Sequence, residues 1–400
     1  MNSGEYRYVW QTPDWPQWRY DLAQLAGPLA EVSRAQGLLF GRMADIGFEL
    51  RARAHLDALT EDVLKSSEIE GEKLNTEAVR SSIARRLGVD VGAAAPKDRH
   101  VEGVVEMVLD ATTNYTATLT RERLYGWHAA LFPTGYSGLV KITVGRWRTD
   151  AEGPMQVVSG RIDRPRVHYE APPAKRLAAE MRAFLRWVNE PSRDPALIKA
   201  GLAHLWFVSI HPFDDGNGRV GRAIGDMLLA RADGSAQRFY SLSGEIERDR
   251  NGYYDHLERA QRGTLDATEW LGWFLSTLDH AVEQAHKTLD AVLAKARFWQ
   301  RLDGEPVNER QRKLLNRLID GFQGNLTNKK WAAVAKCSAD TALRDITDLL
   351  ERGILRKLDA GGRSTSYELA EVQGLDLKRA ERSGAEIEAE EDAQDLDPGR

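Results

Sequence analysis

A polar, glycine-rich segment between two apolar runs is the feature that most constrains the fold of this chain. Residues 211–222 read HPFDDGNGRVGR, and apolar runs of helical character lie at 202–208 and 223–229. Because a proline disfavours the α-helical conformation of the residue before it, Pro212 predicts that the first helix ends near His211. The sequence therefore predicts two core helices that are joined by a tight polar loop.

Most of the remaining chain also has a helical pattern. Apolar residues recur at three- and four-residue spacing, which predicts a mainly α protein. Residues 135–169 instead show short alternating segments, such as 144–148, and predict a loop with a β-hairpin. Residues 307–370 show three helical segments and then two short strands, 354–358 and 364–369, joined by a turn at 359–362. That order is the outline of a winged helix.

Breaks in these patterns divide the chain into five predicted segments. They are an N-terminal helical domain (1–115), a central helical domain with the hairpin (116–285), a linker helix (286–306), a winged-helix module (307–370) and a tail (371–400). The tail has ten acidic residues against four basic ones, a composition that predicts disorder. A chain of 400 residues is long enough for two or three domains.

Composition limits the class of protein. With 42% hydrophobic residues, 29% charged residues and a net charge of −5, the chain is not one whose whole surface binds nucleic acid. A single cysteine, Cys337, excludes a disulfide framework within the chain and a cysteine-based zinc site. No apolar run approaches the roughly 18 residues of a membrane span, and the start lacks an apolar signal segment. We therefore expect a cytoplasmic protein without membrane contact.

The loop at 211–222 has the chemistry of a nucleotide site. Gly216 to Gly218 can turn successive backbone N–H groups toward one point, and the helix that follows adds its dipole. Arg219 and Arg222 lie on neighbouring positions of that helix and can both reach a polyphosphate. Asp215 supplies an oxygen ligand of the kind that Mg²⁺ prefers. Together with a histidine that can act as a base, this set predicts nucleotidyl transfer.

The loop matches the motif HPFx[D/E]GNGRxxR at every specified position, and the chain therefore resembles the Fic family. Residues 145–148 and 167–173 are similar to the family's segments that enter and leave a β-hairpin flap. Residues 250–254 and 270–274 are similar to the last helices of its domain. The resemblance implies transfer of AMP from ATP to a serine, threonine or tyrosine hydroxyl of a protein, the chain itself included.

The resemblance also implies roles for single residues. His211 would be the catalytic base, Asp215 would hold Mg²⁺ between the α- and β-phosphates, and Arg222 would meet the γ-phosphate. The other nucleotide-binding positions that it implies are Gly216, Asn217, Gly218, Arg219, Val220 and Gly221, with Tyr254 or its neighbour Tyr253 beside the adenine. Residues 154–158 of the flap would bind the target protein as an added strand.

Residues 66–71, which read SSEIEG, fit the family's inhibitory pattern [S/T]xxxE[G/N] through Ser66, Glu70 and Gly71. A Glu70 carboxylate bound to the Arg222 guanidinium would occupy the position that the γ-phosphate needs, so we expect autoinhibition. Glu68 is the second candidate, because its spacing from Ser66 does not fit the pattern and no glycine follows it.

Two other functions stay open at this point. The same residues would serve removal of AMP from a target, with Glu70 positioning a water. Alternatively, the chain would be a transcriptional regulator whose Fic core only senses nucleotide. Residues 306–369 carry twelve basic and eight acidic residues, but the candidate recognition helix is itself acidic. DNA and a protein are therefore equally expected as partners of this module, and a homodimer is a further open alternative.

Overall fold

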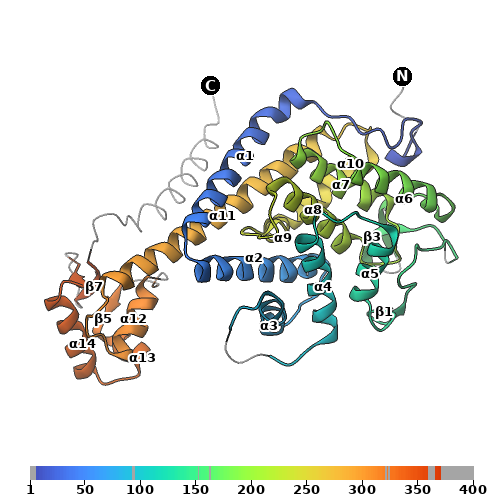
Figure 1. Cartoon of the computed structure of the whole chain (residues 1–400). Coiled ribbons are helices and arrows are strands. Elements are labelled where there is room, and N and C mark those ends of the chain that lie inside the picture. Colours follow the sequence, from blue (N-terminus) through green and yellow to red (C-terminus); the bar gives the residue numbers. More distant parts are fainter. Residues whose placement is uncertain are drawn as a thin grey trace, which may run out of the picture. The chain divides into compact units, whose positions relative to one another are not determined.

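The computed structural model describes residues 6–91, 95–151, 153–161, 164–319, 322, 325–358 and 365–370 (Figure 1). The chain forms two compact units, residues 1–287 and 288–400. Helices dominate both units, which confirms the predicted mainly α fold. In the ranges just given, no helix combines the length and the apolar character that crossing a bilayer requires. The predicted tail, 371–400, lies outside the described residues.

The first unit consists of helices and two small β-hairpins. Its elements are the 3₁₀ turn η1 (Val9–Gln11), α1 (Leu22–Asp45), α2 (Phe48–Ile69), α3 (Thr76–Leu87), α4 (Arg99–Thr113), α5 (Arg121–Leu131), β1 (Tyr136–Ser137), β2 (Val140–Lys141), β3 (Gln156–Arg161), β4 (Arg164–Glu170), α6 (Ala174–Asn189), α7 (Ala196–Ile210), α8 (Asn217–Asp233), α9 (Leu242–Arg248), α10 (Arg250–Arg262) and the first part of α11 (Thr268–Arg301).

Helix α7 is the core of the first unit because its sequence is apolar on every side. It ends at Ile210, as predicted, and nearly all of its residues are buried. A helix of this kind must be covered all round. Helices α6 and α8 pack against it, and Trp270 of α11 donates a hydrogen bond of 2.9 Å to the Gly201 carbonyl. The loop after α7 therefore starts from a fixed point.

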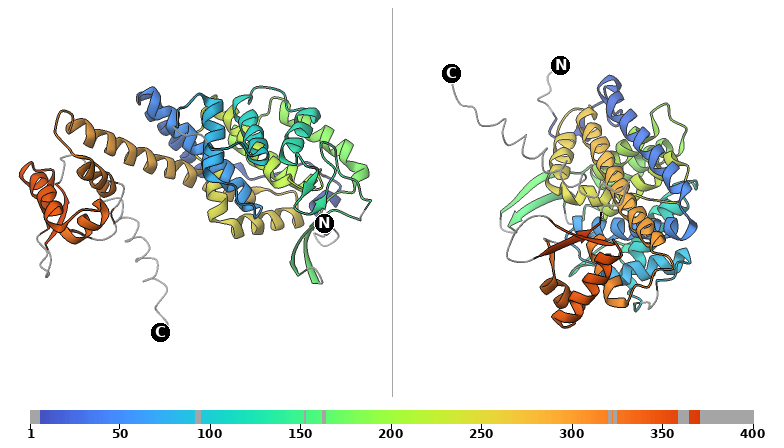
Figure 2. Two further views of the ribbon diagram at one scale, coloured as in Figure 1. Left: turned by 90° about the horizontal axis from the view of Figure 1, so that it is seen from below. Right: turned by 90° about the vertical axis from the view of Figure 1, so that its left-hand side faces the viewer.

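The β3–β4 hairpin is the predicted flap, and it projects from the helical body in both views of Figure 2. Gln156 pairs with Glu170, and the register shifts between Val157 and Val158. Arg262 of α10 donates hydrogen bonds to the carbonyls of Val167 and His168, at 2.7 and 2.8 Å. Among the described residues β3 pairs with β4 alone. The other edge of β3 is therefore open.

Residues 144–148 belong to the loop part of the predicted loop and hairpin. They form an irregular segment in which the Arg148 side chain is buried. The backbone N–H of Arg148 donates to the Pro212 carbonyl at 2.9 Å, so the hydrogen bonds of this segment go to the loop after α7 and not to a neighbouring strand.

The second unit has the predicted order of three helices and two strands, with one additional short strand. Its elements are the rest of α11, α12 (Glu309–Ile319), β5 (Leu326–Thr327), α13 (Asn328–Ala335), α14 (Ala339–Glu351), β6 (Leu355–Lys357) and β7 (Ser366–Leu369). The sheet order is β5-β7-β6, with antiparallel pairs. The predicted turn at 359–362 lies outside the described residues. The predicted linker helix, 286–306, is largely the second half of α11, because no proline or glycine interrupts the helix before Gly304.

The acidic side chains of α14 are partly neutralised inside the second unit. Arg310 donates to the Asp345 carboxylate at 2.9 Å, and Arg352 donates to the Asp348 carboxylate at 3.2 Å. The predicted repulsion between this helix and DNA phosphates is therefore weaker than the sequence suggests. The partner of this unit stays a prediction.

We expect Gly103→Ala to destabilise the first unit. Helix α4 crosses α5 so closely at this point that a Cβ on Gly103 would lie 1.8 Å from the Ala130 carbonyl oxygen. Overpacking of this kind costs about 1–3 kcal/mol. Urea denaturation followed by circular dichroism measures the effect. Gly37→Ala in α1 is the matched control, because nothing lies within 4 Å of its Cβ position. An unchanged midpoint for Gly103→Ala would contradict this packing.

Candidate active site

His211 stands at the junction between α7 and the polar loop, in the left-handed conformation (φ 50°, ψ 59°). Its N–H still bonds the Phe207 carbonyl at 3.0 Å, and its Nδ1 lies 3.2 Å from the Val208 carbonyl oxygen. A carbonyl only accepts, so this contact assigns the proton to Nδ1 and leaves the lone pair on Nε2. The imidazole is therefore set up as a base at Nε2.

The environment of His211 keeps the imidazole neutral. Burial lowers its pKa to about 4, and the positive charge of Arg148 acts in the same direction. At neutral pH the ring is therefore unprotonated, which is the form that can take a proton from a hydroxyl.

The loop that follows is closed by its own side chains. Asn217 accepts from the Phe213 N–H at 2.9 Å and donates to the Phe213 carbonyl at 2.8 Å. The fully buried Phe213 ring stacks on His128 of α5, with centroids 4.2 Å apart. The Asn217 side chain therefore shapes the loop, and only its backbone is left to meet the nucleotide that the motif predicts there.

Helix α8 begins with free backbone donors. Gly216 takes φ 78° at its N-cap, and a Cβ there would lie 2.8 Å from the Phe132 ring, so only glycine fits. The N–H of Val220 already bonds the Gly216 carbonyl at 3.0 Å. The N–H groups of residues 217–219 precede that first helical bond, and they form an anion site at the helix start.

Val220 and Gly221 face α7. The Val220 side chain is fully buried, and a Cβ on Gly221 would lie 2.8 Å from Val208. The structure thus gives both residues a packing role, and their contact with a nucleotide stays a prediction.

Arg219 and Arg222 are both buried, with 4% and 1% of their surface exposed. Arg219 Nε and Arg222 Nη1 make no hydrogen bond to any described residue. A buried donor without an acceptor costs roughly 1–3 kcal/mol, and more when it is charged. Two such nitrogen atoms beside a helix N-terminus indicate that an anionic ligand supplies the missing oxygen atoms.

The inhibitory motif is the last turn of α2 and the reversal that follows it. The N–H of Gly71 bonds the Glu68 carbonyl at 2.8 Å, and the N–H of Glu72 bonds the Ser67 carbonyl at 3.0 Å. Gly71 has φ +81°. This is a Schellman ending, which needs glycine at the reversal. It fixes Glu70 before the turn and Glu72 after it.

Glu70 binds Arg222, as the motif predicted. The carboxylate accepts from Arg222 Nη2 at 2.7 Å, and Ser66 accepts from the same guanidinium at 2.9 Å through its hydroxyl and 2.8 Å through its carbonyl. A Cβ on Gly218 would lie 2.0 Å from the Glu70 carboxylate, so that carboxylate covers the helix start. Glu68 pairs with Lys65 instead, at 2.6 Å.

A second carboxylate, Glu72, binds Arg219. The distance from Arg219 Nη1 to Glu72 Oε2 is 2.8 Å, and the other oxygen of Glu72 lies 2.5 Å from His100 Nε2. The contact with His100 lowers the pKa of Glu72 and raises the pKa of His100. Sequence analysis missed Glu72. The only available signal was an acidic residue on each side of Gly71.

Asp215, the predicted metal ligand, is half-buried and held from three sides. Its Oδ2 accepts from the Ser137 hydroxyl, its Oδ1 accepts from the Gly216 N–H at 2.5 Å, and its carbonyl lies 3.2 Å from His128 Nε2. Each carboxylate oxygen has a second lone pair. A single carboxylate beside phosphates suffices for Mg²⁺, so the donor set fits the ion.

The two predicted adenine-binding tyrosines differ in position. Tyr253 is buried, and its hydroxyl lies 3.0 Å from His204 Nε2. Tyr254 is 37% exposed, and its hydroxyl donates to the Ile69 carbonyl at 3.3 Å. Tyr254 therefore lies next to the end of α2, and its contact with adenine stays a prediction.

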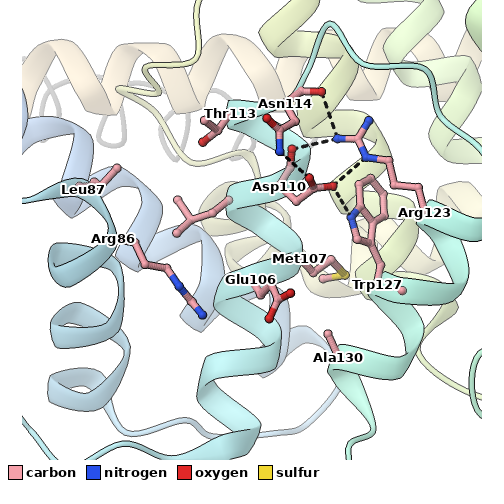
Figure 3. Close-up of a pocket in the computed structure, with 12 residues that line it drawn as sticks. Arg86, Leu87, Glu106, Met107, Asp110, Thr113, Asn114, Arg123, Trp127 and Ala130 are labelled. Carbon is pink, nitrogen blue, oxygen red and sulfur yellow. Dashed lines mark hydrogen bonds and ion pairs between the residues drawn. The ribbon is translucent and has the colours of Figure 1, made fainter.

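A cavity of about 570 Å³ lies beside α5 (Figure 3). Helices α3, α4 and α5 line it. Its most prominent polar group, Asp110, already accepts from Arg123 and Trp127, both at 2.7 Å. No residue of the loop at 211–222 lines this cavity. This cavity is therefore separate from the predicted catalytic loop.

Two regions of the chain are similar to known protein families. The sequence model of the Fic/DOC family matches residues 118–229, and residues 8–89 match a model described as a domain of unknown function (DUF4172). A "Protein adenylyltransferase Fic" of Nematostella vectensis is 30% identical over 151 residues, which are 36% of this chain and 31% of the relative. One of Aedes aegypti is 28% identical over 249 residues, which are 58% of this chain and 45% of the relative. This chain thus spans less than half the length of both.

Among solved structures, a Fic family protein from Desulfovibrio desulfuricans G20 is similar, with a TM-score of 0.48 and 21% sequence identity. The similarity covers 86% of this chain and 95% of that protein.

We expect His211 to titrate with a pKa of about 4, because its buried ring disfavours the charged form. The imidazole is then neutral above that pH and becomes protonated as the pH falls through it. Histidine-labelled NMR across pH 3–8 measures the titration, and His211→Asn identifies its signal. An ordinary titration close to pH 6.5 would contradict the buried placement.

Proposed function

Because the chain belongs to the Fic/DOC family through residues 118–229, we propose that it is a protein adenylyltransferase, an enzyme that transfers AMP from ATP to a protein hydroxyl. The observation that carries this proposal is the occupied anion site at the start of α8. There a carboxylate covers the helix N-terminus and binds a buried arginine, beside a neutral histidine. A polyphosphate needs the same donors.

In this reaction the target hydroxyl oxygen attacks the α-phosphorus of ATP. Nε2 of His211 takes the hydroxyl proton, the new O–P bond forms, and the bond to pyrophosphate breaks. The N–H groups of residues 217–219 and the guanidinium groups of Arg219 and Arg222 hold the phosphate oxygen atoms. Their contribution is orientation and charge neutralisation, which dominate such transfers.

Asp215 is the residue that would hold Mg²⁺. The ion would neutralise phosphate charge when bound. Ser137 and the Gly216 N–H keep the carboxylate oriented toward the helix start before any ligand arrives.

The target segment would add to the open edge of β3, through residues 154–158. Val158, which is 52% exposed, offers an apolar contact beside main-chain hydrogen bonds. Strand addition of this kind is a common way to bind an extended peptide.

In this proposal, two carboxylates inhibit the enzyme before ATP binds. Glu70 occupies Arg222 and Glu72 occupies Arg219, so both phosphate-binding arginines are engaged before ATP arrives. ATP must therefore exchange its oxygen atoms for those of the two carboxylates. His100 offers Glu72 an alternative partner when that exchange occurs.

His211→Ala should abolish AMP transfer and leave ATP binding nearly unchanged, because binding belongs to the helix start and the arginines. A general base typically contributes a factor of about 10² to 10⁴. Transfer of radiolabelled AMP and calorimetric titration with ATP measure the two quantities. A transfer rate near the parent value would remove His211 from its role.

Glu70→Gly should raise the rate of AMP transfer, self-modification included, by well over about tenfold. Removal of the carboxylate frees Arg222 for the γ-phosphate, and tenfold needs only about 1.4 kcal/mol of barrier. The assay is labelling with each of the four nucleoside triphosphates in cell lysate, read by gel and mass spectrometry.

Glu68→Gly is the matched control for Glu70→Gly, because its side chain pairs with Lys65 and should leave the rate unchanged. Adding Arg222→Ala to Glu70→Gly should abolish the gain. Equal rates for Glu70→Gly and the parent would exclude autoinhibition by Glu70. Faster release of AMP from a modified target by the parent than by Glu70→Gly would favour the reverse reaction.

Glu72→Gln should tighten ATP binding about two- to fivefold, which is the range for one partly exposed ion pair. The amide keeps the size of the side chain but no longer competes as an anion for Arg219. Isothermal titration with ATP in the Glu70→Gly background measures the change, with Glu68→Gln as the control. An unchanged dissociation constant would contradict the role of Glu72.

A further inference from the structure

The Arg148 side chain is completely buried beside the catalytic loop, although arginine side chains are rarely completely buried. All three of its outer nitrogen atoms are used. Nε donates to the His211 carbonyl at 2.7 Å, Nη2 donates to the Pro172 carbonyl at 2.6 Å, and Nη1 donates to Asp150 at 3.0 Å. Its backbone N–H also donates to Pro212, as described above. One residue therefore bonds two successive carbonyls of the loop.

The His211 backbone needs such support. A non-glycine residue in the left-handed conformation costs roughly 1–2 kcal/mol and persists where its surroundings hold it. The N–H of His211 is held by α7, while its carbonyl and that of Pro212 are held by Arg148. The direction in which the imidazole leaves the backbone depends on both attachments.

Arg148 also connects this loop to the base of the flap. Pro172 follows β4, and Asp150 precedes β3. The Asp150 carboxylate accepts from the Ala174 N–H at 2.6 Å, at the start of α6. The guanidinium thus joins the base-bearing residue to the segments that enter and leave the flap.

We propose that Arg148 is a positioning residue that sets the catalytic direction of His211 and couples it to the flap. This inference rests on the proposed transferase activity. The Arg148 side chain is completely buried, so it has no exposed surface for nucleotide or target to touch. Its loss should therefore lower the rate of the chemical step and spare nucleotide affinity.

The test compares Arg148→Met, Arg148→Lys and Arg146→Gln in the full-length Glu70→Gly protein. Methionine fills the volume without a hydrogen-bond donor. Lysine restores the charge on one nitrogen atom, which cannot reach the three separate acceptors at once. Arg146 lies two residues away on the surface and is the matched control. Melting temperature, ATP dissociation constant, KM for ATP and kcat are measured for each variant.

We expect Arg148→Met to lower kcat at least about tenfold with the KM for ATP within about twofold, because the position of His211 affects the transition state and not the binding of ATP. Arg148→Lys should recover part of kcat, and Arg146→Gln should match its parent. An unchanged kcat in a folded Arg148→Met protein would overturn the proposal. So would a parallel loss of kcat, ATP affinity and melting temperature in both Arg148 variants.

If the Glu70→Gly parent transfers no AMP, the proposed function is rejected, but the positioning role of Arg148 is not. A second measurement then tests that role. Histidine-labelled NMR follows the His211 ring without any reaction. Loss of Arg148 should change its chemical shift and raise its titration midpoint, because a nearby positive charge and the tight enclosure are both lost. An unchanged His211 signal in Arg148→Met would overturn the positioning role.

Discussion

The Arg222 guanidinium is the charge around which the rest of the site is arranged. A buried cation is tolerated only with partners, and removal of a partner leaves an uncompensated charge. Here Ser66 supplies two neutral acceptors and Glu70 supplies the anion. Because Ser66 and Glu70 belong to α2 and Arg222 belongs to α8, the same contacts attach the N-terminal helices to the catalytic loop. The proposed inhibition and the packing of the N-terminal helices thus share one set of bonds.

The end of α2 determines how these bonds are distributed. Its Schellman turn at Gly71 places Glu70 and Glu72 on the two sides of a reversal, so that each reaches a different arginine of α8. In the proposed reaction, ATP would bring oxygen anions to the same two guanidinium groups. In each exchange an anionic phosphate oxygen would replace an anionic carboxylate oxygen on an arginine. Which of the two anions binds depends on geometry and on the alternative partners that each carboxylate has. Glu72 also pairs with His100, whereas among the described residues Glu70 forms an ion pair with Arg222 alone.

The sequence was sufficient for the parts of the fold that local rules control. The end of helix α7 could be predicted because an apolar run stops at Pro212, and Glu70 could be named as the partner of Arg222 from its spacing to Ser66. Residues 144–148 could be predicted only as part of a loop with a hairpin, because Arg148 of that segment bonds a loop more than sixty residues away. Glu72 and Arg148 were missed for the same reason. Their partners are set by tertiary contacts that spacing along the chain does not encode.

These long-range contacts also determine how the parts of the site act together. The His211 ring is oriented by Val208 within its own helix, but its backbone is held by Arg148, which comes from the segment before the flap. Asp215 is held by Ser137 from β1, and its carbonyl by His128 from α5. Each chemical group of the loop therefore depends on an element outside it. A target strand paired with β3 would contact the hairpin whose entering and leaving segments Arg148 joins. Binding of a target would thereby affect the position of His211.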